Sequence, residues 1–119
     1  MNRESEIGNY YWFICEDGVD IANAQKYVCV CARLESVGRS GWLTLVRDDG
    51  TTFKQQSGRL YSTILDALQE SVEHLLMALT VPEDWRWHLS EREASVRLRY
   101  LIAACEEALL STNETEETP

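Results

Sequence analysis

The 119-residue chain has few glycines and histidines, two residue types on which many cofactor and catalytic sites depend. Its six glycines are scattered, so the sequence contains neither a Gly-x-Gly-x-x-Gly fingerprint nor a Gly-Lys-Ser/Thr phosphate loop. Its two histidines, His74 and His88, fit no Ser-His-Asp, Cys-His or Glu-x-x-His spacing. We therefore expect no cofactor and no enzymatic activity.

Long apolar runs are missing as well. No run approaches the 18 residues of a membrane span, and the chain does not open with a charged segment followed by an apolar one. We expect a cytoplasmic protein, in which the four cysteines remain free thiols. Cys29 and Cys31 stand two positions apart on an expected strand, which suits neither a zinc pair nor a mutual disulfide, so we expect no metal site.

Positive charge is scarce. The chain has 20 acidic and 11 basic residues, a formal net charge of −9. Such a charge disfavours direct binding to nucleic acid or to an anionic membrane, because both attract Lys and Arg. The expected partner is therefore a basic protein surface. The shortage of basic residues is greatest over residues 60–85, which contain five carboxylates and no Lys or Arg.

Three of these carboxylates recur at i, i+4 and i+7 of an expected helix, and Met77 falls near them by helical angle. Like charges on one helix face repel by roughly a few tenths of a kcal/mol per pair, so a helix built only for stability would alternate their signs. We interpret this face as a partner-binding surface; the alternative is an ordinary solvated face. Its candidate residues, with two acids at its end, are Asp66, Glu70, Glu73, Met77, Glu83 and Asp84.

The segment Trp85-Arg86-Trp87-His88 follows directly. Trp and Arg are the residues most enriched at binding hot spots, and a simple linker seldom uses two tryptophans. We therefore add Trp85, Arg86 and Trp87 to the partner-binding candidates. The alternative is that one tryptophan closes the end of the hydrophobic core.

The first half of the chain predicts β-strands. Residues 10–15 are dense in aromatic and β-branched side chains, and residues 26–34 alternate with the period of a strand. Residues 42–47 and 51–54 flank Asp48-Asp49-Gly50, a strong hairpin signal. We expect an antiparallel meander of three or four strands.

After Gly58 the apolar period changes from 2 to 3.6 and predicts helices over residues 62–80 and 90–110. Thr63, with Asp66 three residues on, makes a capping-box-like start, Ser90 opens a capping box with Glu93, and Leu89 is placed as a hydrophobic staple. The expected core positions are Tyr61, Ile64, Leu65, Leu68, Val72, Leu75, Leu76 and Leu79 in the first helix, and Ala94, Leu98, Leu101, Cys105 and Leu109 in the second.

We thus expect one α+β domain over residues 1–110, a small antiparallel sheet with two helices packed on one face, followed by a flexible acidic tail at 111–119. In size, acidity and lack of a catalytic motif the chain resembles small inhibitor, immunity and antitoxin proteins and phage-encoded anti-CRISPR proteins. The resemblance covers bulk properties and carries no residue across. It implies a non-enzymatic protein that occupies a basic, nucleic-acid-binding type of site on a partner. The alternative is a homo-oligomeric, structural or chaperone-like domain, such as a homodimer.

Overall fold

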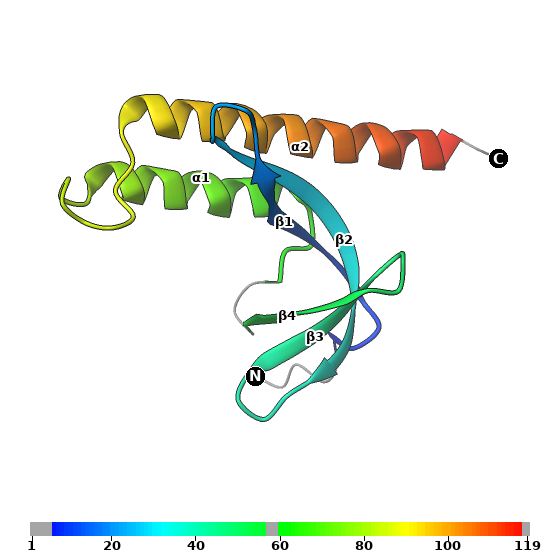
Figure 1. Ribbon diagram of the computed structural model, residues 1–119. Helices are drawn as coiled ribbons and strands as arrows, with labels where there is room; N and C mark the ends of the chain where they lie inside the picture. Colours follow the sequence, from blue (N-terminus) through cyan, green and yellow to red (C-terminus); the bar gives the residue numbers. More distant parts are fainter. Residues whose placement is uncertain (1–5, 57–59, 118–119) are drawn as a thin grey trace.

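The computed structural model describes residues 6–56 and 60–117, with side chains described as far as Thr112. Four antiparallel strands are followed by two α-helices that lie side by side over one part of the sheet (Figure 1). This arrangement confirms the expected α+β class, with strands first and helices second. None of the helices in the described residues is long and apolar enough to cross a membrane.

The strands form a simple meander in the order β1-β2-β3-β4, with β1 at Tyr10–Val19, β2 at Gln25–Val37, β3 at Trp42–Arg47 and β4 at Thr52–Gln56. β1 and β2 are longer than the sequence predicted. The β1–β2 turn is closed by Asp20, whose Oδ1 accepts hydrogen bonds from the backbone N–H groups of Ala22 and Ala24, each at 2.9 Å.

The sheet curls because β2 pairs with different strands along its length. Its first part pairs with β1, and its last residues pair with β3, with a register shift between Leu34 and Ser36. Such a bulge bends a strand and increases its twist. The concave side encloses one core cluster, whose buried members are Tyr11, Phe13, Ala32, Leu34, Leu43 and Leu45.

The other side of β1 and β2 carries the helices. Ile14, Tyr27 and Cys29 point to this side, since side chains alternate between the faces of a strand. They pack against the cores formed with α1 (Ile64–Thr80) and α2 (Glu91–Glu117). The helix pair therefore builds its core on the back of a sheet that already has a core of its own.

Both helices begin where the sequence places their caps. The Oγ1 atom of Thr63 accepts the N–H of Asp66 at 3.1 Å, and the Oγ atom of Ser90 accepts the N–H of Glu93 at 3.2 Å. The carboxylate of Glu93 in turn accepts the Ser90 N–H at 3.3 Å, which completes the predicted capping box. α2 ends at Glu117, past the predicted end at residue 110.

The predicted core faces were wrong at three positions. Leu65, Leu76 and Leu109 are exposed, by 69%, 56% and 44% respectively. Small side chains are buried in both helices instead, namely Ala67, Ala78, Ala104 and Ala108. Alanine lets a helix approach its neighbour closely, so each helix places its row of small side chains inside. The apolar face of each helix is wider than this row, and part of it therefore remains exposed.

Candidate functional site

The acidic stripe, defined as Asp66, Glu70, Glu73 and Met77, lies on the side of α1 turned away from its buried residues Ile64, Ala67, Leu75 and Ala78. Asp66 and Glu73 are exposed and Glu70 is partly exposed. The Glu70 carboxylate lies 3.1 Å from Nε2 of His74, and the Gln69 amide donates to Glu73 at 3.5 Å. No Lys or Arg lies within the stripe, so its negative charge faces solvent, as the sequence predicted.

The connector between the helices is held by hydrogen bonds to its own backbone. The Trp85 N–H donates to Pro82 O at 2.9 Å, and the His88 N–H donates to Trp85 O at 3.0 Å. The ring nitrogen Nδ1 of His88 lies 2.9 Å from Val81 O, and the Leu89 N–H reaches back to Ala78 O at 3.2 Å. The connector is therefore a folded turn that presents its side chains in defined positions.

Both tryptophans of this turn are exposed. Trp85 retains 50% and Trp87 52% of its accessible surface, and the two rings meet edge to face with centroids 5.5 Å apart. The alternative in which one tryptophan closes the core is therefore wrong. The buried side chain of Leu89 takes that place, packed with Leu75 and Ala94. Glu83, Asp84 and Arg86 are exposed on the same turn.

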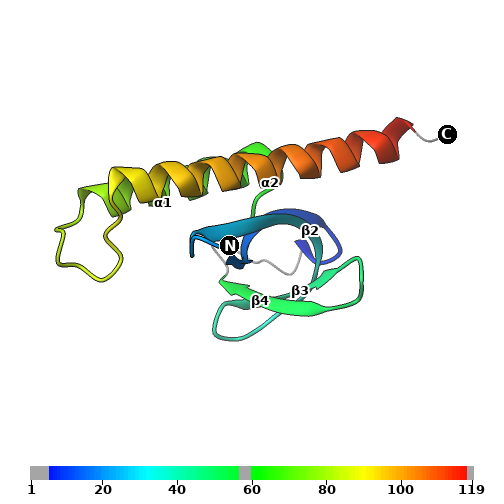
Figure 2. The same ribbon diagram turned by 45° about the horizontal axis from the view of Figure 1, so that its top comes forward.

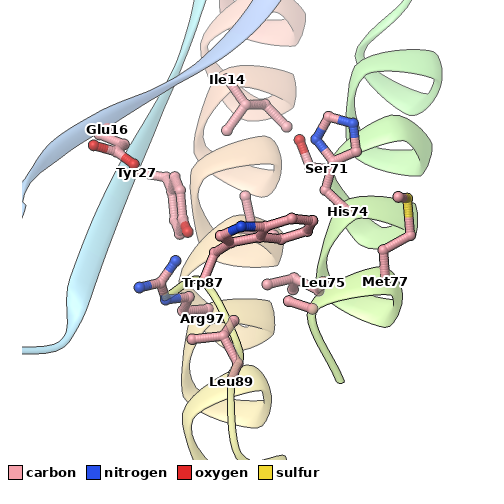
Figure 3. Close-up of a pocket in the computed structure, with 12 residues that line it drawn as sticks. Ile14, Glu16, Tyr27, Ser71, His74, Leu75, Met77, Trp87, Leu89 and Arg97 are labelled. Atoms are coloured by element: carbon pink, nitrogen blue, oxygen red, sulfur yellow. The ribbon is translucent and has the colours of Figure 1, made fainter. Parts of the chain in front are cut away.

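A cavity of about 540 Å³ lies beside the turn (Figure 3). The close-up shows the indole of Trp87 pointing into it, with Met77 and His74 on the α1 side. Its apolar lining residues are Ile14, Tyr27, Leu75, Met77, Ala78, Trp87, Leu89 and Leu101. Its polar lining residues are Glu16, Ser71, His74 and Arg97. We call this cavity the tryptophan groove.

The tryptophan groove joins the two surfaces predicted from sequence. Met77 belongs to the acidic stripe and Trp87 to the connector, and both line the groove. His74, which lines it as well, is the residue that contacts Glu70. Asp66 lies eleven residues before Met77, about 17 Å away along the helix axis, and therefore extends the stripe away from the groove.

Sequence reasoning missed the groove because five segments build it. β1 contributes Ile14 and Glu16, β2 contributes Tyr27, and α2 contributes Arg97 and Leu101, while α1 and the connector supply the rest. No local pattern brings these residues together. Met77 and Trp87 were the groove residues that the sequence singled out, and Tyr27 offered one further signal, as a large aromatic side chain on the same strand side as Cys29.

The four cysteines are free thiols. Burial raises the pKa of Cys29 to about 12, with a further contribution from Cys105 on the facing helix. Burial also raises the pKa of Cys15, Cys31 and Cys105 above the ordinary value. Among residues 6–56 and 60–117, no three His, Cys, Asp or Glu side chains come together in a way that could hold a metal ion.

Searches for similar proteins found no matching family model, no matching curated protein and no matching solved structure.

Proposed function

We propose that this chain is a non-enzymatic binding protein that occupies a basic site on a partner protein. One observation carries the proposal: Met77 of the exposed acidic stripe and Trp87 line the same groove, and the exposed ring of Trp85 packs against Trp87. Binding surfaces combine a few aromatic anchors with a charged surround in this way.

The two parts have different roles in binding. Trp85 and Trp87 are large, are ordered by the turn, and remain half exposed, so they supply apolar area at little further cost in side-chain entropy. The carboxylates of the stripe attract a basic partner and speed its encounter. Affinity then depends mainly on the tryptophan groove, and association rate mainly on the stripe.

The charge pattern favours a partner site of the kind that holds nucleic acid. Asp66, Glu70 and Glu73 form a line of negative charge on a rigid helix, and Glu83 and Asp84 add two more acids beside the tryptophans. Such a line offers a cationic groove the same kind of charge as a phosphate backbone. An inhibitor, an immunity protein or a phage anti-defence protein of the anti-CRISPR kind would act in this way.

A charge-reversal experiment tests the proposal. The chain is immobilised and used to capture proteins from its native host, and captured proteins are eluted by increasing salt. The triple variant Asp66→Lys, Glu70→Lys, Glu73→Lys is expected to lose the partner. Because these side chains face solvent, its melting temperature should stay near that of the unchanged protein.

The control variant carries the same change in charge elsewhere. Asp17, Glu35 and Glu107 are exposed acids outside the stripe and the groove, and replacing all three with Lys should leave capture intact. Trp87→Ala should weaken binding at least about tenfold without changing its salt dependence. A stripe variant that binds as strongly as the unchanged protein would refute the proposal.

A further inference from the structure

The edge of β2 that faces away from β1 is unpaired over the first half of the strand. Pairing with β3 begins only at Ala32, opposite Arg47, whereas pairing with β1 extends back to Gln25. Residues 25–31 therefore have a neighbouring strand on one side only. No turn or loop of the described residues closes the other side with a backbone hydrogen bond.

Every second residue of this segment directs its backbone N–H and C=O groups outward. The N–H of Trp12 donates to Tyr61 O at 2.8 Å, on the side of β1 away from β2. Antiparallel strands bond through alternate residues, so β1 bonds to β2 through the residues before and after Trp12, the latter opposite Val30. By the same alternation, the backbone groups of Tyr27 and Cys29 point out from the free edge of β2.

A cleft of about 640 Å³ follows this edge. All four residues at 28–31 of β2 line it, although successive side chains of a strand point to opposite faces of the sheet. A cavity over one face would be lined by every second residue of the strand, so this cleft lies beside the strand. We call it the edge cleft.

The edge cleft has α2 on one side and the β3–β4 turn on the other. Figures 1 and 2 show the last turns of α2 running past β2, with the β3–β4 turn on the same side of the molecule. The α2 residues that line the cleft are mostly small, which leaves room for the side chains of an added strand; they are Ala104, Glu107, Ala108, Ser111 and Thr112. Arg47, Asp48 and Asp49 line the opposite side.

We propose that the edge cleft binds an extended peptide segment of a partner protein, which adds to β2 as a further strand. The outward N–H and C=O groups of Tyr27 and Cys29 hydrogen-bond to the backbone of this segment. An extended chain presents donors and acceptors at the matching spacing, because its own backbone groups alternate in the same way. A second copy of this chain fits less well, since its own β2 edge lies between the same two walls.

Charge around the edge cleft favours a basic segment. Asp48, Asp49 and Glu107 are exposed acids on its walls. Arg47 is the one basic residue among the described residues that line the cleft, and its guanidinium lies over the ring of Phe53, 5.0 Å from the centroid. Beyond the cleft α2 adds three more acids and no Lys or Arg, and the helix dipole places further negative charge at this end.

The edge cleft shares no lining residue with the tryptophan groove. Its ligand is therefore recognised separately from a partner at the acidic stripe, and the proposal does not rest on the function proposed above. The expected ligand is a strand in which Lys or Arg alternates with apolar residues.

The probe is a short fluorescein-labelled peptide of alternating lysine and valine, and its dissociation constant is measured by fluorescence anisotropy. The same peptide with proline in place of valine keeps the charge but cannot form a strand, and should not bind. Asp48→Lys should raise the dissociation constant of the lysine–valine peptide at least about threefold. Asp17→Lys is the matched control, since Asp17 is an exposed acid outside the cleft and should leave peptide binding unchanged.

Amide hydrogen exchange, followed by NMR, tests the addition of a strand itself. The N–H groups of Tyr27 and Cys29 should exchange quickly in the free protein and at least about tenfold more slowly with saturating peptide. The N–H groups of Val28 and Val30 are the internal control, because they already bond to β1 and their slow exchange should change far less.

Failure of the lysine–valine peptide to bind would overturn the proposal, and would leave the acidic stripe to be judged by its own variants. Equal binding of the proline peptide, or no added protection at Tyr27 and Cys29, would overturn strand addition. Binding insensitive to Asp48→Lys would overturn the preference for a basic segment. A free protein that sediments as a dimer with these two amides already protected would show a second copy in the cleft, and would overturn the proposal as well.

Discussion

The hydroxyl of Tyr100 on α2 donates a hydrogen bond to the carboxylate of Asp20, 80 residues earlier, with the two oxygens 2.5 Å apart. Asp20 also accepts two backbone N–H groups and so closes the β1–β2 turn. One carboxylate thus shapes the tip of the longest hairpin and attaches it to the last helix.

This contact makes stability depend on pH at both extremes. The Tyr100 hydroxyl and the Ala24 N–H lower the pKa of Asp20 in the folded protein. The stability that ionised Asp20 contributes is therefore fully present above the pKa that Asp20 has in the unfolded chain. It is lost as the pH falls through the pKa that Asp20 has in the folded protein. The Asp20 carboxylate raises the pKa of Tyr100 in the folded protein. The stability that the protonated Tyr100 hydroxyl contributes is therefore fully present below the pKa that Tyr100 has in the unfolded chain, and it is lost as the pH rises through its pKa in the folded protein. Tyr100→Phe should lower the melting temperature by a few degrees at neutral pH and weaken both pH dependences. Equal pH profiles of melting temperature for the variant and the unchanged protein would contradict this.

The capping box at Ser90 should be measurable in the free energy of unfolding. The Ser90 hydroxyl and N–H donate to the Glu93 carboxylate and lower its pKa. The Oγ atom of Ser90 also accepts the backbone N–H of Glu93 and so caps the start of α2. Ser90→Ala should cost about 1 kcal/mol in urea unfolding, as loss of an N-cap usually does. Ser95→Ala, at an exposed position of the same helix, should change stability by less than about 0.5 kcal/mol. Equal costs for the two variants would show that the cap contributes nothing.

Leu101 lies where the core of the helix pair meets the strands. It is almost completely buried, packed in one cluster with Leu75, Leu89 and Ala94, whereas Leu110 on the same helix is exposed. Leu101→Ala should cost about 2–5 kcal/mol, because it leaves a cavity that the surrounding residues refill only in part. Leu110→Ala is the control and should be close to neutral, because Leu110 is exposed. A cost below about 1 kcal/mol at Leu101 would mean that the helices pack less closely than the structure shows.

The thiols should react slowly while the protein is folded. Burial raises the pKa of Cys29 to about 12, so near neutral pH its reactive thiolate is roughly a thousandfold rarer than in an ordinary cysteine. Labelling with a disulfide reagent near neutral pH should proceed much faster in denaturant than in buffer, and Cys29 should be among the last sites modified, as read by peptide mass spectrometry. Rapid labelling of Cys29 in the folded protein would contradict the buried environment.

Local structure followed from the sequence with little error. The third strand was predicted at its exact bounds, 42–47, because β-branched and apolar residues end there at a clear turn signal. The caps at Thr63 and Ser90 were predicted correctly, because a capping box is made by residues only three positions apart. The exposure of Asp66 and Glu73 followed from the cost of burying charge.

Tertiary structure decided which part of each wide apolar helix face is buried. The sequence could not separate Leu65, Leu76 and Leu109 from true core positions, because hydrophobicity does not reveal how closely two helices approach. Contact with the sheet and between the helices selected the small side chains Ala67 and Ala104 for the inside. The same contacts built the tryptophan groove from segments far apart in the chain. Composition and spacing thus determined the elements and their charge, while the close packing of the helices on the curled sheet determined which surfaces remain available for binding.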